Sequence, residues 1–202
     1  MPGVVLAVIE HPDAAGRVLA AAQCLAARAG AVRINVLAVR RPPIDTIMPT
    51  EEVLTRKAEI SIRDEERRRT ATLKAIFDVW AAAAQLRSLA TEWFDVEGRV
   101  EQVVGEWGRR VDFVVLTRPS RRYAEPERQA IHAALFDTDR PVLVVPPEWK
   151  PSPFGRRVAI AWREDGRTSK AVLAALRWLG GAERIDVLAG ARPGAIAPRL
   201  SD

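Results

Sequence analysis

The chain has 202 residues, of which 48% are hydrophobic and 28% charged, and its 31 basic and 26 acidic side chains give a formal net charge of +5. This composition excludes a disordered chain, and the length predicts one globular domain, or one domain and a fragment of another. A single cysteine excludes an internal disulfide framework, and two histidines are too few for a typical zinc site.

The first predicted element is a strand at Val4–Ile9, a continuous apolar run of the kind that is buried on both faces of a sheet. Glu10 ends this run early and no basic segment precedes it, so we expect no secretory signal. No apolar run approaches the roughly 20 residues of a membrane span. We therefore expect a cytoplasmic protein with no membrane partner.

A βαβ unit is predicted over the first 39 residues of the chain. An Ala-rich helix follows His11-Pro12-Asp13 and ends near Gly30, and a second strand follows at Arg33–Val39. Strands joined through a helix in this way run parallel, with a right-handed crossover.

A long second helix is predicted after a proline-containing loop at residues 40–49, with Thr50 as its N-cap. Its middle, Arg63–Arg69, places Glu65 four residues before Arg69. Because such i,i+4 pairs support exposed helices, we interpret this basic run as a solvated face rather than a nucleic-acid patch. The expected buried stripe follows at Leu73, Ile76, Phe77, Trp80 and Ala84.

Three further strands are predicted, near residues 89–94, 112–116 and 141–145, with helices between them. One helix spans Arg99–Arg110, and the next begins around Pro126. The expected apolar face of the latter holds Ile131, Ala134 and Leu135. Five strands alternating with four helices predict an open, mostly parallel α/β sheet.

The opening unit recurs beyond a proline-rich linker at residues 146–153. Val18-Leu19-Ala20-Ala21 reappears as Val172-Leu173-Ala174-Ala175, and Arg33–Ala38 as Arg184–Ala189. We interpret this as a tandem duplication. It predicts a first domain over residues 1–147, a linker over 148–156 and a truncated second repeat over 157–202.

The truncated repeat predicts a dimer. Two strands and one helix cannot close a core of their own, and their open edges invite pairing. We therefore expect a homodimer, formed through the last strand of the first domain and the segment at residues 157–189.

The pattern resembles the universal stress protein family in its tandem form. Ala134-Leu135-Phe136, leading into Arg140–Pro146, carries the resemblance most clearly, together with the opening strand, Asp112–Leu116 and the restart at Arg157–Trp162. The resemblance implies a Rossmann-like five-stranded sheet in the order 3-2-1-4-5, a role in stress response, and a ligand at the switch point between strands one and four. General topology places a ligand there as well.

The candidate ligand-binding residues are those expected to line this crevice. They are Glu10, His11, Asp13, Val39, Thr117, Arg118, Arg121, Arg122 and Arg128. No catalytic or metal-ligating residue is proposed, because no Ser or Cys nucleophile has a convincing setting near His11 and Asp13.

A glycine loop after strand four carries the phosphates in nucleotide-binding members of the family, which the resemblance would place at residues 117–129. The stretch 117–122 contains no glycine, and Pro119 removes a backbone donor. Arg128-Gln129 stands where a Gly-Ser/Thr pair belongs. We therefore expect no ATP or other nucleotide cofactor bound in the usual way.

Two interpretations of the arginine-rich loop stay open. Arg118, Arg121, Arg122 and Arg128 would grip a small anion or a nucleotide tail with their guanidinium forks, which describes an anion-binding regulator, with or without weak ATP hydrolysis. Alternatively, the loop is solvated and its arginines are partnered by Glu125 and Glu127. We favour the solvated loop and a non-catalytic stress-response protein; a nucleic-acid partner is disfavoured, because arginines interleaved with aromatic residues are absent.

Overall fold

The computed structural model describes residues 3–45, 55–83, 89–119 and 124–189. The chain divides into two units, Met1–Pro151 and Ser152–Asp202. The division falls inside the proline-rich segment 146–153. No helix among the described residues is long and apolar enough to cross a membrane.

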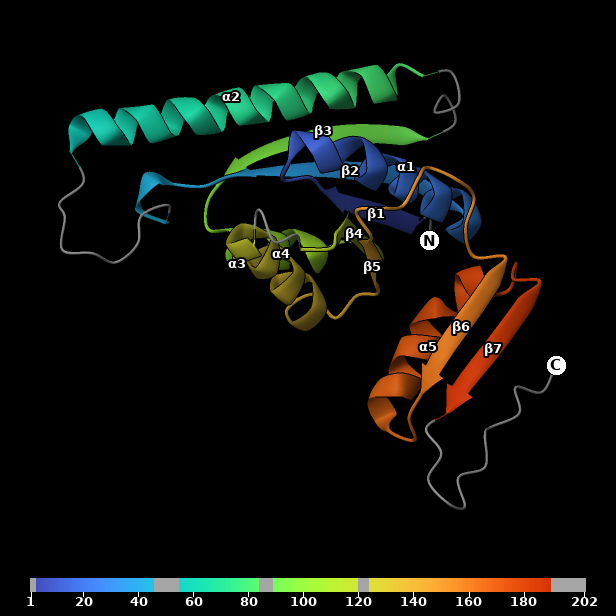
Figure 1. Cartoon of the computed structure of the whole chain (residues 1–202). Helices are drawn as coiled ribbons and strands as arrows, with labels where there is room; N and C mark the ends of the chain where they lie inside the picture. The colour runs from blue at the N-terminus through green and yellow to red at the C-terminus, as the bar shows by residue number, and fades with distance from the viewer. Residues whose placement is uncertain (1–2, 46–54, 84–88, 120–123, 190–202) are drawn as a thin grey trace. The chain divides into compact units, whose positions relative to one another are not determined.

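The first unit is built on a five-stranded parallel sheet in the order β3-β2-β1-β4-β5 (Figure 1). Its strands are β1 (Gly3–Val8), β2 (Ala31–Arg40), β3 (Ala90–Glu97), β4 (Phe113–Thr117) and β5 (Val142–Val145). The predicted sheet, its parallel direction and its strand order are confirmed. The topology reverses between β1 and β4, which pair through Val5↔Phe113 and the two residues that follow.

Helices cover both faces of this sheet. They are α1 (Pro12–Ala29), α2 (Arg56–Ala81), α3 (Val100–Gly108) and α4 (Ala124–Phe136), with a short 3₁₀ turn, η1, at Pro43–Asp45. Helices α1 and α2 pack together on one face, and α3 and α4 on the other (Figure 1). Helix α1 ends where Gly30 takes a left-handed conformation, φ 64°, which costs glycine nothing.

The central strand β1 is apolar on both faces because both layers of helices bury it. Leu6 and Val8 belong to the cluster that packs against α3 and α4. Val5 and Ala7, which alternate with them, point to the opposite face and are equally buried. Burial of this continuous apolar run, at about 25 cal/mol per Å² of apolar surface, anchors the sheet.

Strand β3 fixes the outer helices through two neighbouring aromatic residues that point to opposite faces. Trp93 lies 5.5 Å from the ring of Phe77 on α2, and Phe94 lies 4.3 Å from the ring of Trp107 on α3. Contacts of this kind add to the burial of the rings. The contact between Trp93 and Phe77 holds α2 against the sheet. Polar side chains of α2 thereby reach the ends of the strands.

The start predicted for the second helix is wrong. Thr50 lies outside the described residues, but Thr55 is extended, at φ −72° and ψ 146°, and its hydroxyl accepts from the N–H of Ala58 at 3.3 Å. Thr55 is therefore the N-cap, and the helix begins at Arg56. Thr50 and Thr55 carry the same hydroxyl group, so the sequence alone does not show which of them caps the helix.

The apolar stripes were predicted in part. In α2, Leu73 and Phe77 are buried and Ala84 lies outside the described residues. In α4, the buried residues of the cluster include Ala130 and Ala134, but Leu135 is 50% exposed. The predicted burial of Leu135 is wrong, because alanines one turn apart supply the contact face and turn Leu135 outward.

The second unit is a single βαβ unit among its described residues. Strands β6 (Arg157–Trp162) and β7 (Arg184–Ala189) pair in parallel, and α5 (Gly166–Leu179) connects them. Asp165 caps α5 by accepting from the N–H of Thr168 at 2.8 Å. Both strands and their helix fall where the sequence placed them. That the unit is a truncated copy of the first stays a prediction.

Candidate functional site

The candidate site lies at the carboxyl ends of β1 and β2, beside the switch point of the sheet. Glu10 and His11 follow β1, and Val39 lies near the end of β2. These three predicted residues line one small hollow together with Arg41 and Arg69. The structure thus brings them together, and it adds two arginines that sequence reasoning did not place there.

Arg69 reaches from α2 across the ends of both strands. Its Nη1 donates to the carbonyl oxygen of Glu10 at 2.7 Å, and its Nη2 donates to that of Val39 at 2.6 Å. The same Nη2 donates to Glu66 Oε2 at 2.7 Å. Only 16% of the Arg69 side chain is exposed. One guanidinium therefore holds two strand-end carbonyls, which are the acceptors a ligand in this crevice would otherwise meet.

Glu66 is the carboxylate that holds Arg69 in place. This buried side chain also accepts from the backbone N–H of Arg41 at 3.1 Å and from Arg41 Nη2 at 2.9 Å. Burial alone would raise the pKa of Glu66, but the hydrogen bond and charge of Arg69, with the charge of Arg41, lower it below its usual value. Glu66 is thus an ionised, fully bonded anchor between α2 and the end of β2.

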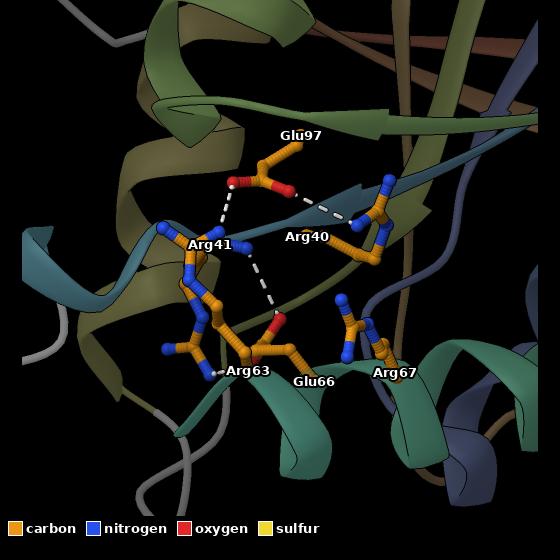
Figure 2. Close-up of a pocket in the computed structure, with 6 residues that line it drawn as sticks. All are labelled: Arg40, Arg41, Arg63, Glu66, Arg67 and Glu97. Carbon is orange, nitrogen blue, oxygen red and sulfur yellow. Dashed lines mark hydrogen bonds and ion pairs between the residues drawn. The ribbon is translucent and has the colours of Figure 1, made fainter. Parts of the chain in front are cut away.

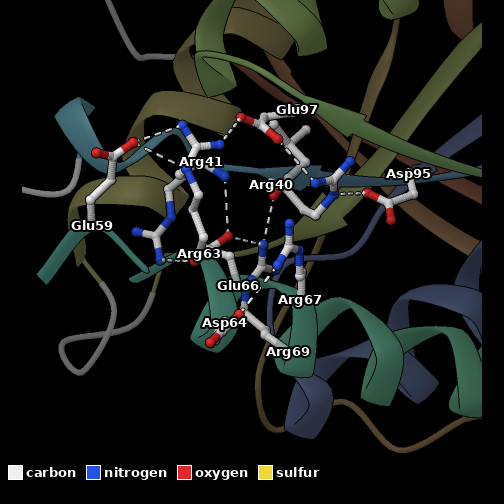
Figure 3. Close-up of polar contacts among 11 residues, drawn as sticks. Arg40, Arg41, Glu59, Arg63, Asp64, Glu66, Arg67, Arg69, Asp95 and Glu97 are labelled. Atoms are coloured by element: carbon white, nitrogen blue, oxygen red, sulfur yellow. Dashed lines mark hydrogen bonds and ion pairs between the residues drawn. The ribbon is translucent and has the colours of Figure 1, made fainter. Parts of the chain in front are cut away.

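A second set of ion pairs extends this cluster outward (Figure 3). Arg40 donates to Asp95 at 2.6 Å and to Glu97 at 3.0 Å, and Arg63 donates to Glu97 at 3.1 Å and to Glu59. Figure 2 shows a second hollow, about 10 Å³ in volume, and the six side chains that line it: Arg40, Arg41, Arg63, Glu66, Arg67 and Glu97. Arg40 and Arg63 therefore neutralise acids of this same chain.

Glu10 lines the small hollow that it shares with His11, Val39, Arg41 and Arg69. Its Oε2 is buried and has no hydrogen-bond partner among the described residues. Burial, followed by the charge of Glu127, raises the pKa of Glu10 to about 7, although Arg69 and Arg41 act in the opposite direction. The hollow that Glu10 lines has a volume of about 10 Å³, enough for about one water molecule. The raised pKa favours the protonated form of Glu10 at pH values where an exposed glutamate is ionised.

His11 faces the first turns of α4. Its Nε2 lies 3.8 Å from Glu127 Oε1, beyond hydrogen-bond distance. Burial and the nearby charge of Arg69 lower the pKa of His11 to about 4, so the ring is neutral at pH 7 and this contact is not an ion pair. The described residues contain no group of three His, Cys, Asp or Glu side chains that could hold a metal ion.

Comparison with known proteins rests on structure. No family model matches the chain, and no curated protein matches its sequence. A universal stress protein from Archaeoglobus fulgidus DSM 4304 superposes with a TM-score of 0.61 over 96% of this chain and 67% of that one, at 12% identity. This chain has the universal stress protein fold.

Two further solved structures carry the same name at lower similarity. A protein of the universal stress protein family from Burkholderia pseudomallei gives a TM-score of 0.43 at 22% identity, covering 71% of this chain and 96% of that one. A universal stress protein in complex with cAMP gives 0.41 at 15% identity, covering 73% and 98%. Both scores are below 0.5 and add nothing to the first comparison.

The remaining candidate residues of this universal stress protein fold are not gathered into one cluster among the described residues. Asp13 is exposed in the first turn of α1, and Thr117 is buried at the end of β4. Arg118 is exposed and pairs with Glu148 at 3.3 Å, and Arg128 is exposed on α4. Arg121 and Arg122 lie outside the described residues.

Glu127 lies in a different setting from the one predicted for it. It was expected to partner the arginines of a solvated loop, but the residue is only 2% exposed and lies against His11. Glu125 has no described side chain. The predicted solvated face at Arg63–Arg69 is likewise wrong for Glu66 and Arg69, which turn inward onto the strand ends.

The sequence does contain a pattern that indicates which residues in the first half of α2 are buried. Glu66 and Thr70 precede Leu73 by seven and three residues, which continues the apolar stripe toward the start of the helix. Both are buried. A charged residue on such a stripe has to be paired, and Arg69, three residues after Glu66, is the partner that the helix itself provides.

Proposed function

We propose that this chain is a non-catalytic stress-response protein of the universal stress protein type, which acts in the cytoplasm by dimerisation and by binding partners, without a bound nucleotide. The fold supports the assignment to the universal stress protein type. The composition of the crevice supports the non-catalytic mode, because Arg69, Glu66 and Arg41 bond to one another beside it and no Ser or Cys is among its described lining residues.

The position of Arg69 carries this proposal. Its guanidinium bonds to the carbonyls of Glu10 and Val39, so the chain supplies from its own α2 the donors that a ligand would bring. The hollow that remains beside it is about 10 Å³. Small-molecule sites in proteins are usually some 300–1,000 Å³. A nucleotide would have to displace Arg69 and leave Glu66 as a buried carboxylate with fewer partners, which is costly.

A homodimer is the second part of the proposal. Val142, Leu143 and Val144 of β5 are apolar yet only half-buried, and β5 is an edge strand of the sheet. In the second unit, Leu173 and Leu188 are strongly exposed. Apolar side chains at open strand edges favour association with another chain. We infer that β5 and residues 157–189 contribute to the dimer interface.

Calorimetric titration of the full chain with ATP and Mg²⁺ tests the nucleotide-free state. We expect no saturable heat, which corresponds to a Kd weaker than about 1 mM. Micromolar binding would contradict the proposal. If that binding were lost in Arg121→Ala, the anion-binding regulator with its arginine loop would be the correct function; the matched variant Arg67→Ala, on α2, controls for loss of one exposed charge.

A further inference from the structure

The open edge of β6 is the feature of the second unit that most needs a partner. Among the described residues, β6 pairs with β7 on one side and with no strand on the other. In the first unit, the corresponding strand is β1, which lies between β2 and β4. If the second unit copies the first as predicted, its described residues include the strand to which a neighbour adds, but not that neighbour.

A groove lies along this edge. It has a volume of about 430 Å³, and the strand residues that line it all belong to β6. Val158 and Ile160 form its wall on the strand side, and Val172, Ala175 and Leu179 form it on α5. Protein interiors are close-packed and hold few voids larger than a water molecule. The groove, which is mostly apolar but is also lined by Arg167 and Thr168, is therefore of the kind that side chains of an added strand fill, and its position favours β6 over the outer edge of β7.

We propose that a second copy of this chain adds its own β6 to this edge, antiparallel, so that two units share one four-stranded sheet across a two-fold axis. This inference rests on the dimer in the proposed function and assigns it an interface. Strand addition satisfies the unpaired backbone groups of both edges at once, and a two-fold axis makes one edge complementary to itself.

Charge supports the antiparallel direction. Arg156 and Arg157 stand at the start of β6, whereas Glu164 and Asp165 follow its end, after Arg163. Pairing two copies in opposite directions brings the basic end of each toward the net acidic end of the other. The residues between, 158–162, carry no charge. With the axis at Ile160, Arg157 of each copy would lie opposite Arg163 of the other, whereas with the axis at Ala161 it lies opposite Asp165, so charge favours the second register.

The alternation of side chains limits the register. Val158, Ile160 and Trp162 share one face of β6, and Ala159 and Ala161 share the other. Residues that lie opposite each other in an antiparallel pair point to the same face of the sheet. In a two-fold pair of β6 strands this holds only if the axis passes through a residue position, because a shift of the pairing by one residue would place side chains of opposite faces opposite each other. With the axis at Ile160, all four alanines of the pair lie opposite an alanine; with the axis at Ala159 or Ala161, that alanine lies opposite its own copy.

Disulfide cross-linking of the full chain tests the assigned edge. In a Cys24→Ala background, we expect mild oxidation of Ala159→Cys/Ala161→Cys to convert the monomer band to a covalent dimer, because cross-strand Cβ atoms lie within disulfide reach. The matched control is Asp186→Cys/Leu188→Cys, which occupies the paired positions on β7. It should remain monomeric on a non-reducing gel.

Sedimentation velocity of the unmodified chain separates the two levels of the proposal. A dimer with cross-linking confined to the β6 variant supports both. A dimer in which the β6 variant does not cross-link, or cross-links no more than the β7 control, would overturn the β6 edge but leave the dimer of the proposed function standing. A monomer would overturn both.

Discussion

Replacing Arg69 by alanine should lower the free energy of unfolding by about 3–5 kcal/mol, the range for removing one partner of a buried ion pair. The substitution leaves Glu66 buried with fewer partners and takes the donor from the carbonyls of Glu10 and Val39. Arg69→Lys should recover little, because a lysine cannot reproduce the planar fork that holds all three acceptors. Urea denaturation followed by tryptophan fluorescence measures the change.

Arg67→Ala is the matched control for that loss. Arg67 lies two residues earlier on the same helix, is 67% exposed and pairs with Asp64 at 3.2 Å. Its removal should cost less than about 0.5 kcal/mol. The double variant Glu66→Ala/Arg69→Ala should be more stable than the sum of the single losses predicts, because the two side chains share one network. Equal small losses at Arg67 and Arg69 would show that Arg69 does not hold the strand ends.

Glu10→Gln should stabilise the protein at high pH and not at low pH. The pKa of Glu10 is about 7 in the folded state and 4.5 in its ordinary state. The folded state therefore binds more protons between these values, and the contribution of Glu10 to stability falls as the pH rises through that window. Relative to the unmodified chain, the variant should gain up to about 3 kcal/mol between pH 4.5 and pH 8. Glu65→Gln, exposed on α2, should show no such gain.

His11→Asn should show the opposite trend. The pKa of His11 is about 4 in the folded state and 6.5 in its ordinary state, so the folded state binds fewer protons between these values. Stability is then lost as the pH falls from 6.5 to 4, and the variant should escape up to about 3 kcal/mol of that loss. His132→Asn, on the exposed side of α4, is its control.

The two slopes oppose each other between pH 4.5 and pH 6.5, so the contributions of Glu10 and His11 to the free energy of unfolding offset each other there. Each single variant should uncover the slope of the remaining group. Unfolding free energies at half-unit pH steps measure both effects. Variant and parent curves that run parallel would mean that neither side chain is buried as the structure has it.

The sheet could be predicted because its strands are fixed by local patterns. Continuous apolar runs such as Val4–Ile9 and Asp112–Leu116 are typical of strands buried on both faces, and the alternation with helices makes them parallel. The strand order 3-2-1-4-5 came from the resemblance to universal stress proteins. Strand β3 extends to Glu97, beyond its predicted end, since Asp95 and Glu97 pair with Arg40 on β2.

The key side chain of the site could not be predicted in the same way. Spacing within α2 shows which residues neighbour one another along the helix, but not that Arg69 reaches carbonyls 59 and 30 residues away in sequence. The i,i+4 rule instead paired Arg69 with Glu65, and so placed it in solvent. Glu127 shows the same limit, because only the packing of α4 brings it to His11.

The claim that Arg69 closes the crevice in place of a ligand is tested most directly by native mass spectrometry of the full chain, taken straight from purification. We expect the mass of the polypeptide alone, as monomer or dimer, because the hollow beside Arg69 holds about one water molecule. A stoichiometric nucleotide adduct that survives gel filtration would contradict it.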